Sequence, residues 1–355
     1  MTDMNGRNFY YNKENYILKL KPEIEKYFKA KQLLIFGIIV PFFIPLKNQN
    51  HLTYHVNKNE LCHYRFHTIE NKVNVYTGAY NEEPLNLPKK CTRVEMVYIS
   101  KDKPSLDKLE EFLSEKFDLL VGGLNQLVSS IIVLTKDPYV SKITREVLDP
   151  TILYSIIDPK NYTLKSEGLF QLNFNKLEQG GGYLTDINTK RVMEGIDLLP
   201  NNPFFRAAEL FYGSKRSLSN GDYTRAVIDS QTSVEIFLTA LYKYLLKKEG
   251  FSKSEIDKKS NEMRFKSMVI DHFHKRLGGD FNVDDIDSPV GNWWENTYLL
   301  RNNVVHEGYL PDFEKTEKCL DAVNTLNNYL TDLFHSEKIK KKYPELSQLV
   351  LKPTN

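Results

Sequence analysis

The spacing of apolar residues changes near residue 200, and this change constrains the fold more than any other feature of the sequence. Upstream, short runs such as residues 61–69 and 93–99 alternate between apolar and polar side chains, as half-buried strands do. Downstream, apolar residues recur at steps of three and four through successive long segments, which is the pattern of amphipathic helices. The sequence therefore predicts an α+β protein, in which a mixed or antiparallel sheet precedes an all-α helical bundle.

A boundary between two domains is expected where the two patterns meet. Residues 197–203 read Asp-Leu-Leu-Pro-Asn-Asn-Pro, and the two prolines would end any helix that entered this segment. A chain of 355 residues is long enough for two domains. We expect residues 1–200 to form an α+β domain that senses or docks a partner, and residues 201–355 to form a helical domain with a basic tail.

The first domain is predicted to hold several strands and one long helix. The apolar run over residues 33–46 is interpreted as two buried strand segments on either side of a proline turn. An unbroken apolar stripe predicts a helix over residues 106–134, with a break or bend at Gly122-Gly123, since each glycine lowers helix stability by about 1 kcal/mol. The other strands are expected at residues 61–69, 72–76, 93–99, 152–157 and 169–174.

The charge balance excludes a polycationic nucleic-acid binder. The chain has 48 Lys and Arg against 46 Asp and Glu, a formal net charge of +2, so any contact with nucleic acid must come from a local patch. No signal-peptide pattern is visible at the N-terminus. The apolar run at residues 33–46 is shorter than the roughly 20 residues that a membrane-spanning helix needs. We expect a soluble, cytoplasmic protein with no membrane partner.

The cysteine and histidine residues do not predict a disulfide framework or a metal site. The three cysteines are too few and too scattered for either. Four histidines lie near Cys62, but Cys62 and His63 alternate faces on the expected strand, and no CxxC or HExxH spacing occurs. We therefore expect no metal and no cofactor. The histidines concerned are His51, His55, His63 and His67.

Five helices are predicted in the second domain. Asp222 is expected to cap the second of them, and Gly308 and Pro311 to end the fourth. Trp293 and Trp294 in the fourth helix are interpreted as anchors of the core or of a dimer interface, rather than as platforms for stacking bases. The expected helices span residues 204–218, 223–248, 254–277, 290–306 and 312–334.

The fourth helix carries the residues that say most about function. Arg301 lies two turns beyond Trp294 on the predicted apolar stripe, and a guanidinium that faces an interior needs a partner or a functional interface. His306 follows five residues later, and Asn302 is its neighbour one turn earlier. An arginine, an amide and an imidazole at a helix C-terminus can supply a phosphate clamp, an aligning hydrogen bond and an acid or base.

This arrangement resembles a known family. The pattern Arg301-Asn302-x-x-x-His306 stands late in a helical region that also contains a Gly-Asp-Tyr turn and the sequence Ser-Val-Glu at residues 233–235. In these features the chain is similar to the HEPN superfamily, and most of all to its Apea-like branch. The resemblance covers about residues 203–334, so the first two hundred residues lie outside it.

The resemblance implies a metal-independent endoribonuclease that acts as a homodimer through its helical domain, with two Arg/His motifs lining one cleft. Arg301 would hold the scissile phosphate of RNA, and His306 would transfer a proton as the 2′-hydroxyl attacks or the 5′ oxygen leaves. Asn302 would orient one of them, and Glu235 is the candidate partner of Arg301 or His306. The products would be a 2′,3′-cyclic phosphate and a 5′-hydroxyl, and DNA should survive because it lacks the 2′-hydroxyl.

Other interpretations of these residues stay open. Arg301 can form a purely structural ion pair with Glu235, and His306 can serve as a cation at a helix C-terminus. The helical domain would then be a non-catalytic module for nucleotide binding or dimerisation.

Four basic residues are further candidates for contacts with RNA phosphates. Lys275 and Arg276 lie at the end of one predicted helix, and Lys340 and Lys341 lie in the C-terminal tail. A solvated helix face and a frayed tail are the corresponding structural interpretations.

The family resemblance also implies a cellular role. An unregulated ribonuclease would damage its own cell, so we expect a toxin or an antiviral-defence effector that a protein trigger activates through the N-terminal domain. An enzymatic activity of the N-terminal domain itself is the third hypothesis, and no concentrated set of acid, base and nucleophile supports it.

Overall fold

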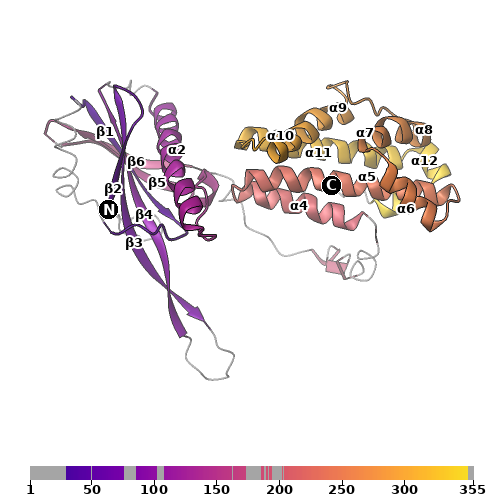
Figure 1. Ribbon diagram of the computed structural model, residues 1–355, viewed down its shortest axis with the longest axis horizontal. Helices are drawn as coiled ribbons and strands as arrows, with labels where there is room; N and C mark the ends of the chain where they lie inside the picture. The colour runs from indigo at the N-terminus through magenta and orange to yellow at the C-terminus, as the bar shows by residue number, and fades with distance from the viewer. Residues whose placement is uncertain are drawn as a thin grey trace. The chain divides into compact units, whose positions relative to one another are not determined.

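Figure 1 shows the computed structural model of the chain. The chain divides into two units, residues 1–180 and 181–355, and each is described by itself. Residues 194–201, which contain the boundary predicted at residue 200, lie outside the described residues. The residues that the structure describes are 29–48, 50–75, 85–101, 108–161, 163–172, 185–187, 189–190, 192–193, 202 and 204–350.

The first unit is built on a six-stranded sheet with the order β2-β3-β4-β1-β5-β6. Every strand pair in this sheet is antiparallel. Together with the helical second unit, it confirms the predicted α+β class, with an antiparallel rather than a mixed sheet. The strands are β1 (Gln32–Val40), β2 (His51–His55), β3 (Glu60–Val75), β4 (Leu85–Ser100), β5 (Thr151–Asp158) and β6 (Thr163–Gln171).

The strand boundaries differ from the sequence prediction in several places. β4 begins at Leu85 rather than at residue 93, and β6 begins at Thr163 rather than at residue 169. The two strands predicted at residues 61–69 and 72–76 are one strand, β3, because β4 pairs with its backbone continuously from Glu60 to Val75. The far halves of β3 and β4 extend beyond the sheet as a two-stranded ribbon (Figure 1). Residues 41–46 form no strand, so the second half of the predicted strand pair is absent, and β2 was not predicted.

One long helix, α2 (Leu109–Thr135), covers one face of this sheet (Figure 1). Its buried side chains recur at steps of three and four and meet core residues of the strands. Phe117 packs edge-on against Phe36 of β1, with ring centroids 5.3 Å apart. Burial of each such side chain contributes about 1.5–3 kcal/mol to folding. The buried helix residues are Leu113, Phe117, Leu120, Val121, Leu124, Val128 and Ile131.

Of the break or bend predicted in this helix at Gly122-Gly123, the break is wrong. α2 continues through both glycines, and Tyr64 of β3 is fully buried against the helix at this point. A Cβ at Gly123 would collide with the Tyr64 hydroxyl, so the missing side chain provides room for a close approach of helix and sheet. The glycine therefore serves packing and does not interrupt the helix.

α2 is the one helix in the described part of the chain that is long and apolar enough to span a membrane. Core helices of globular domains meet the same criterion of length and composition. In this structure its apolar stripe packs on the sheet. The expectation that the protein has no membrane partner stays a prediction.

The two faces of β3 separate as its alternation predicts. Cys62, Tyr64 and Phe66 lie in the core under α2. On the other face, the carboxylate of Glu95 on β4 is buried within ion-pair distance of three basic side chains. Arg65 and Arg93 each lie 3.9 Å from Glu95, and His67 lies 3.7 Å away. These buried charges would be costly alone, and their mutual pairing offsets that cost.

The second unit is a bundle whose four long helices largely match the predicted ones. α5 (Tyr223–Lys248) starts at Asp222, whose side chain accepts a hydrogen bond from the Arg225 amide, which confirms the predicted cap. The helix predicted at residues 290–306 runs without interruption from Pro289 to His306 as α9 (Pro289–Trp293), η5 (Trp294–Leu299) and α10 (Leu300–His306). The other two are α4 (Phe205–Ser219) and α11 (Phe313–Phe334).

Two predictions for the second unit need correction. The helix expected at residues 254–277 is interrupted, because Met263 and Arg264 have extended backbone angles. The tail also forms helices, and the fully buried Ile339 and Leu346 bind it to the bundle, so it is not frayed throughout. The segments concerned are α6 (Lys253–Glu262), α7 (Phe265–Ser267), η4 (Met268–Phe273), α8 (His274–Leu277), α12 (Glu337–Lys342) and α13 (Leu346–Leu349).

Candidate active site

The Arg301, Asn302 and His306 side chains lie on α10, the last part of the long helix that begins at Pro289. Arg301 and Asn302 are half-buried, whereas His306, the final residue of the helix, is exposed. Gly308 follows with a φ of +68°, a left-handed conformation that glycine adopts readily and that turns the chain away from the helix. The three predicted residues therefore share one accessible helix end.

The guanidinium of Arg301 has one hydrogen bond and one unsatisfied nitrogen. Its Nη1 donates to Oδ1 of Asn302 at 3.2 Å. Its Nε is shielded from solvent and has no hydrogen-bond partner among the described residues. A buried donor without an acceptor costs about 1–3 kcal/mol, which an anion bound at the guanidinium would offset. The contact joins two of the three motif side chains, and the orienting role that the family resemblance implies for Asn302 stays a prediction.

Glu235 on α5 is engaged elsewhere. Its Oε1 accepts a hydrogen bond of 3.1 Å from Gln231, one turn earlier on the same helix. The side-chain oxygen of Gln231 in turn accepts from the indole nitrogen of the fully buried Trp293, at 3.0 Å. Within the described residues, the hydrogen bonds and ion pairs of Glu235 do not include Arg301 or His306. The suggested partnership stays a prediction. The contact observed for Glu235 is its hydrogen bond from Gln231, which in turn binds Trp293 near the start of the long helix.

Aromatic packing fixes the position of the candidate helix. Trp293 has no exposed surface, which confirms its predicted role as a core anchor. Trp294 is also buried, and its ring stacks on Tyr298 with a centroid distance of 3.9 Å. Thr297 lies between Trp294 and Arg301 in the sequence and is fully buried. Its hydroxyl donates a hydrogen bond of 3.0 Å to the backbone carbonyl of Cys319 on α11. The helix therefore presents Arg301 in a fixed orientation relative to α11.

A stretch of π-helix separates Trp294 from Arg301. Residues Trp294–Leu299 form η5, in which each turn contains more residues than an α-helical turn. Because the π-helical turn holds more residues, the side chains that follow it point in directions rotated about the helix axis from those of a continuous α-helix. Arg301 consequently lies half-buried at the edge of the packed face, while Val304 lies within it. The sequence, read with regular α-helical spacing, predicts Arg301 on the packed stripe itself.

The four basic residues predicted to contact RNA differ in their availability. Arg276 is half-buried and forms a bidentate ion pair with Glu249, with nitrogen–oxygen distances of 2.6 and 2.9 Å. Lys340 lies 3.5 Å from a carboxylate oxygen of Glu337 on its own helix. Lys275 and Lys341 are exposed. Arg276 is thus committed to structure, and the lysines remain accessible.

These basic residues lie far from the Arg301–His306 helix end. α10 precedes and α12 follows the 22-residue helix α11, which is about 33 Å long. Figure 1 shows α10 at one end of the helical unit and α8 and α12 at the other. Lys342 of α12 also donates to the backbone carbonyl of Arg276, which joins the two basic segments to each other. The structure brings the basic residues together, but not beside the candidate catalytic residues.

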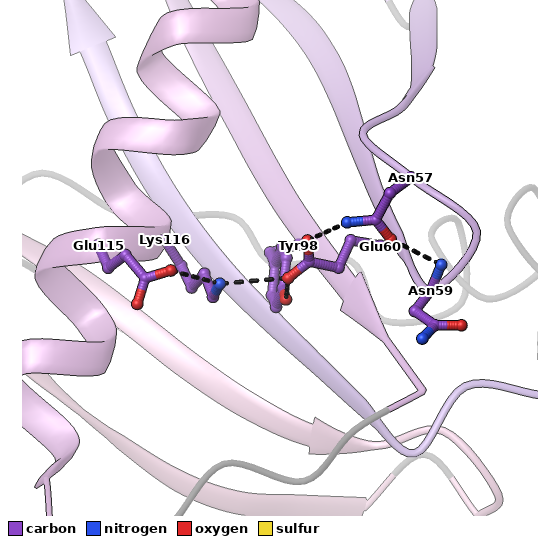
Figure 2. A network of polar contacts seen from close by, with 6 residues as sticks. All are labelled: Asn57, Asn59, Glu60, Tyr98, Glu115 and Lys116. Atoms are coloured by element: carbon purple, nitrogen blue, oxygen red, sulfur yellow. Dashed lines mark hydrogen bonds and ion pairs between the residues drawn. The ribbon is translucent and has the colours of Figure 1, made fainter.

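The first unit contains a polar network around Glu60 that the sequence did not predict. Figure 2 shows Glu60 of β3 accepting hydrogen bonds from Tyr98 of β4 and from Lys116 of α2, the latter at 3.2 Å. The bond from Tyr98 is the main reason that the pKa of Glu60 is lowered, and burial raises the pKa of Tyr98 to about 12. The Lys116 ammonium also lies 5.0 Å from the centroid of the Tyr98 ring. This network fastens α2 to the sheet.

The histidines that the sequence analysis weighed as metal ligands are arranged for other contacts. Cys62 is in the core and His63 is on the opposite face, as expected. His63 bonds to Thr53 at 2.9 Å and stacks on His51. Within the described ranges, no group of three or more His, Cys, Asp or Glu side chains is placed to hold a metal ion. The three cysteines are buried and not joined in disulfides.

Comparisons with known proteins give no support for or against the family resemblance. The chain matches no family model, no curated protein and no solved structure.

Proposed function

We propose that this protein is a metal-independent endoribonuclease of the HEPN type that cleaves RNA at the Arg301–His306 end of its long helix. The observation that supports it most is the state of Arg301, which is bonded to Asn302 on one side and carries a buried Nε without an acceptor on the other. A guanidinium held in this way is prepared for an anion. The exposed imidazole of His306 follows on the same short helix.

The proposed reaction needs only these side chains and the RNA. The 2′-hydroxyl attacks the adjacent phosphorus atom, and the bond from phosphorus to the 5′ oxygen of the next nucleotide breaks. His306, or its copy in a second protomer, moves the proton in this exchange. Arg301 stabilises the charge that develops on the phosphate oxygens. The products are a 2′,3′-cyclic phosphate and a 5′-hydroxyl.

The surroundings of His306 support the proposed homodimer. Three apolar side chains within seven residues of His306 in the sequence are exposed, with Leu299 at 38%, Val305 at 46% and Leu310 at 62%. Exposed apolar groups clustered around a polar site favour an interface with another chain. A two-fold axis through this surface would place two Arg/His pairs opposite each other, as the proposal requires.

The test is an RNA cleavage assay in EDTA with purified protein, total RNA and tRNA. Wild-type protein should cut RNA and spare DNA of the same sequence, and Arg301→Ala and His306→Ala should not cut. Asn303→Ala is the matched control, because Asn303 is an exposed residue of the same helix outside the motif. Equal RNA degradation by wild type and His306→Ala would refute the proposal.

The cellular role is proposed on the same basis. We infer a toxin or antiviral-defence effector that acts in the cytoplasm and is released by a protein trigger at the N-terminal unit. Expression of wild type beside Arg301→Ala, with growth and RNA integrity measured together, tests this role. Growth arrest with intact RNA in both cultures would contradict it.

One observation favours a second function, a non-catalytic module for nucleotide binding or dimerisation. The accessible lysines among the predicted RNA contacts, Lys275, Lys340 and Lys341, lie about one α11 length from Arg301, so they do not flank the candidate catalytic residues of the same protomer. In this case, alanine variants of Arg301 and His306 would lower thermal stability or dimer affinity, and the wild type would show no ribonuclease activity.

A further inference from the structure

A groove with a volume of about 290 Å³ runs between α4 and α11, with α5 contributing to its lining. α4 supplies aromatic side chains, among them Phe205, Phe211 and Tyr212. Ser233 and Phe237 of α5 also line it, and Ser233 is 3% exposed. The volume is close to the lower end of the range for small-molecule sites, so the groove fits one ring system better than an extended ligand.

The contribution of α11 to this groove is a row of amide side chains. Asn324, Asn327 and Asn328 occupy one face of the helix at offsets of three and four residues. None of the three side chains makes a hydrogen bond with another described residue; the bond at this point is from Thr331 to the backbone carbonyl of Asn327. Each amide therefore offers both donors and an acceptor to a ligand.

These asparagines also run against the local preference of the helix. Asparagine is a weaker helix former than alanine, leucine or glutamine, because its side chain competes for backbone hydrogen bonds. The three lie within five residues in the middle of α11; Asn324 and Asn328 are exposed and Asn327 is half-buried, so their amides are accessible from the groove.

The ammonium group of Lys215 lies next to the aromatic side of the groove. Nζ of Lys215 is 4.9 Å from the centroid of the Phe211 ring and 5.8 Å from that of Tyr212. The residues described as lining the groove are all uncharged. The groove is thus neutral inside and cationic at one edge, which suits a ligand with a neutral planar part and an anionic group attached to it.

We propose that this groove binds a nucleobase that carries a phosphate, with the base between the aromatic and amide side chains and the phosphate at Lys215. An aromatic surface stacks on any base, and asparagine amides can pair with the hydrogen-bonding edge of a base. The base belongs either to an unpaired nucleotide of an RNA strand or to a free nucleotide. The inference concerns a site separate from Arg301, Asn302 and His306, so it depends neither on the proposed cleavage activity nor on nucleotide binding by those residues.

The test measures binding by the full-length protein with two kinds of probe. Calorimetric titrations use the four ribonucleoside monophosphates, the corresponding nucleosides and a short single-stranded oligoribonucleotide. Tyr212→Ala should weaken binding by about tenfold or more, since base–aromatic stacking carries a contribution of that size. Tyr212 is 61% exposed, so its removal leaves the core intact. Tyr139→Ala, at a tyrosine that is 85% exposed in the other unit, is the matched control.

Two further variants separate the parts of the ligand. Asn328→Ala should weaken nucleosides and nucleotides alike, whereas Lys215→Ala should weaken only the probes with a phosphate. Saturable binding of a monophosphate identifies a free nucleotide as the ligand, and binding of the oligoribonucleotide alone identifies an RNA strand. Absence of saturable binding for all probes at millimolar concentration, or equal binding by Tyr212→Ala and Tyr139→Ala, overturns the inference. The cleavage assay with Arg301→Ala is independent of either result.

Discussion

The hydroxyl group of Tyr64 on β3 donates a hydrogen bond of 2.9 Å to the backbone carbonyl of Leu120 on α2. The same ring occupies the space beside Gly123, where the Cζ atom of Tyr64 would lie 3.4 Å from an added Cβ and the hydroxyl closer still. One buried tyrosine thus holds the helix to the sheet and requires a glycine opposite. Gly122, its neighbour, has open space around it.

The two adjacent glycines should respond to alanine in opposite directions. Gly123→Ala should lower the free energy of unfolding by about 1–3 kcal/mol, because the new methyl group overpacks the interface. Gly122→Ala should raise it by up to about 1 kcal/mol, because alanine is the better helix former and meets no neighbour. Urea denaturation followed by circular dichroism measures both. A similar loss in the two variants would show that Tyr64 does not approach Gly123 as described.

Removal of the Tyr64 hydroxyl should relieve the effect of Gly123→Ala. Tyr64→Phe alone loses one buried hydrogen bond and about 1 kcal/mol of stability. In that background, Gly123→Ala should cost less than it does in the wild type, since the atom that blocks the methyl group is gone. A double-mutant cycle gives the coupling energy directly. Additive effects would contradict the proposed collision.

The Glu60 network should make stability depend on pH in the acid range. The hydrogen bond from Tyr98 lowers the folded-state pKa of Glu60 below its usual value of 4.5. The stabilisation is therefore complete above the unfolded-state pKa and is lost as the pH falls through the lower folded-state pKa. Denaturation midpoints measured from pH 7 down to pH 3 should fall less steeply for Glu60→Gln than for the wild type. Parallel curves for the two proteins would exclude this contribution.

Arg276 should prove to be a structural residue and Lys341 should not. Arg276→Ala removes two charge-assisted hydrogen bonds to Glu249 and should lower stability by about 1–3 kcal/mol. Lys341→Ala, at an exposed position of α12, should leave stability within about 0.5 kcal/mol of the wild type. Thermal unfolding distinguishes them. Equal melting temperatures would show that the Arg276–Glu249 pair is of no consequence in solution.

In the proposed ribonuclease, Arg301→Lys should lose most of the RNA-cleavage activity of the wild type. A lysine keeps the charge but lacks the planar fork that binds two phosphate oxygens at once. Loss of such a group costs roughly 100-fold or more in rate, and loss of the proton-transferring His306 has a comparable effect. Initial rates on a fluorogenic oligoribonucleotide in EDTA provide the measurement. Near wild-type rates for Arg301→Lys would mean that Arg301 contributes only charge.

Periodicity in the sequence was sufficient to locate the four long helices of the second unit. α5 has the predicted bounds of residues 223–248, and the Pro289–His306 helix begins one residue before its predicted start. Helices can be predicted in this way because their hydrogen bonds are local, so an apolar stripe and a cap such as Asp222 are both visible along the chain.

Features that depend on distant partners could not be read in the same way. β2 and the joined β3 exist because neighbouring strands supply their hydrogen bonds, and the Glu60 network forms because Tyr98 and Lys116 arrive from other elements. The π-helical turn before Arg301 shifts a stripe that was counted with α-helical spacing. Sequence distance likewise gave no sign that the basic residues and Arg301 lie at opposite ends of α11.

The class of fold, the bounds of the long helices and the types of side chain available for chemistry can be predicted from local periodicity and residue identity. Which of those side chains are free to act depends on contacts that form only in the folded chain. Glu249 binds Arg276 from another helix, Trp293 donates to Gln231 across the bundle, and Nε of Arg301 is shielded from solvent with no acceptor among the described residues. The reason is physical: a charged group's availability depends on which partners folding places within hydrogen-bonding distance, and those partners come from anywhere along the chain.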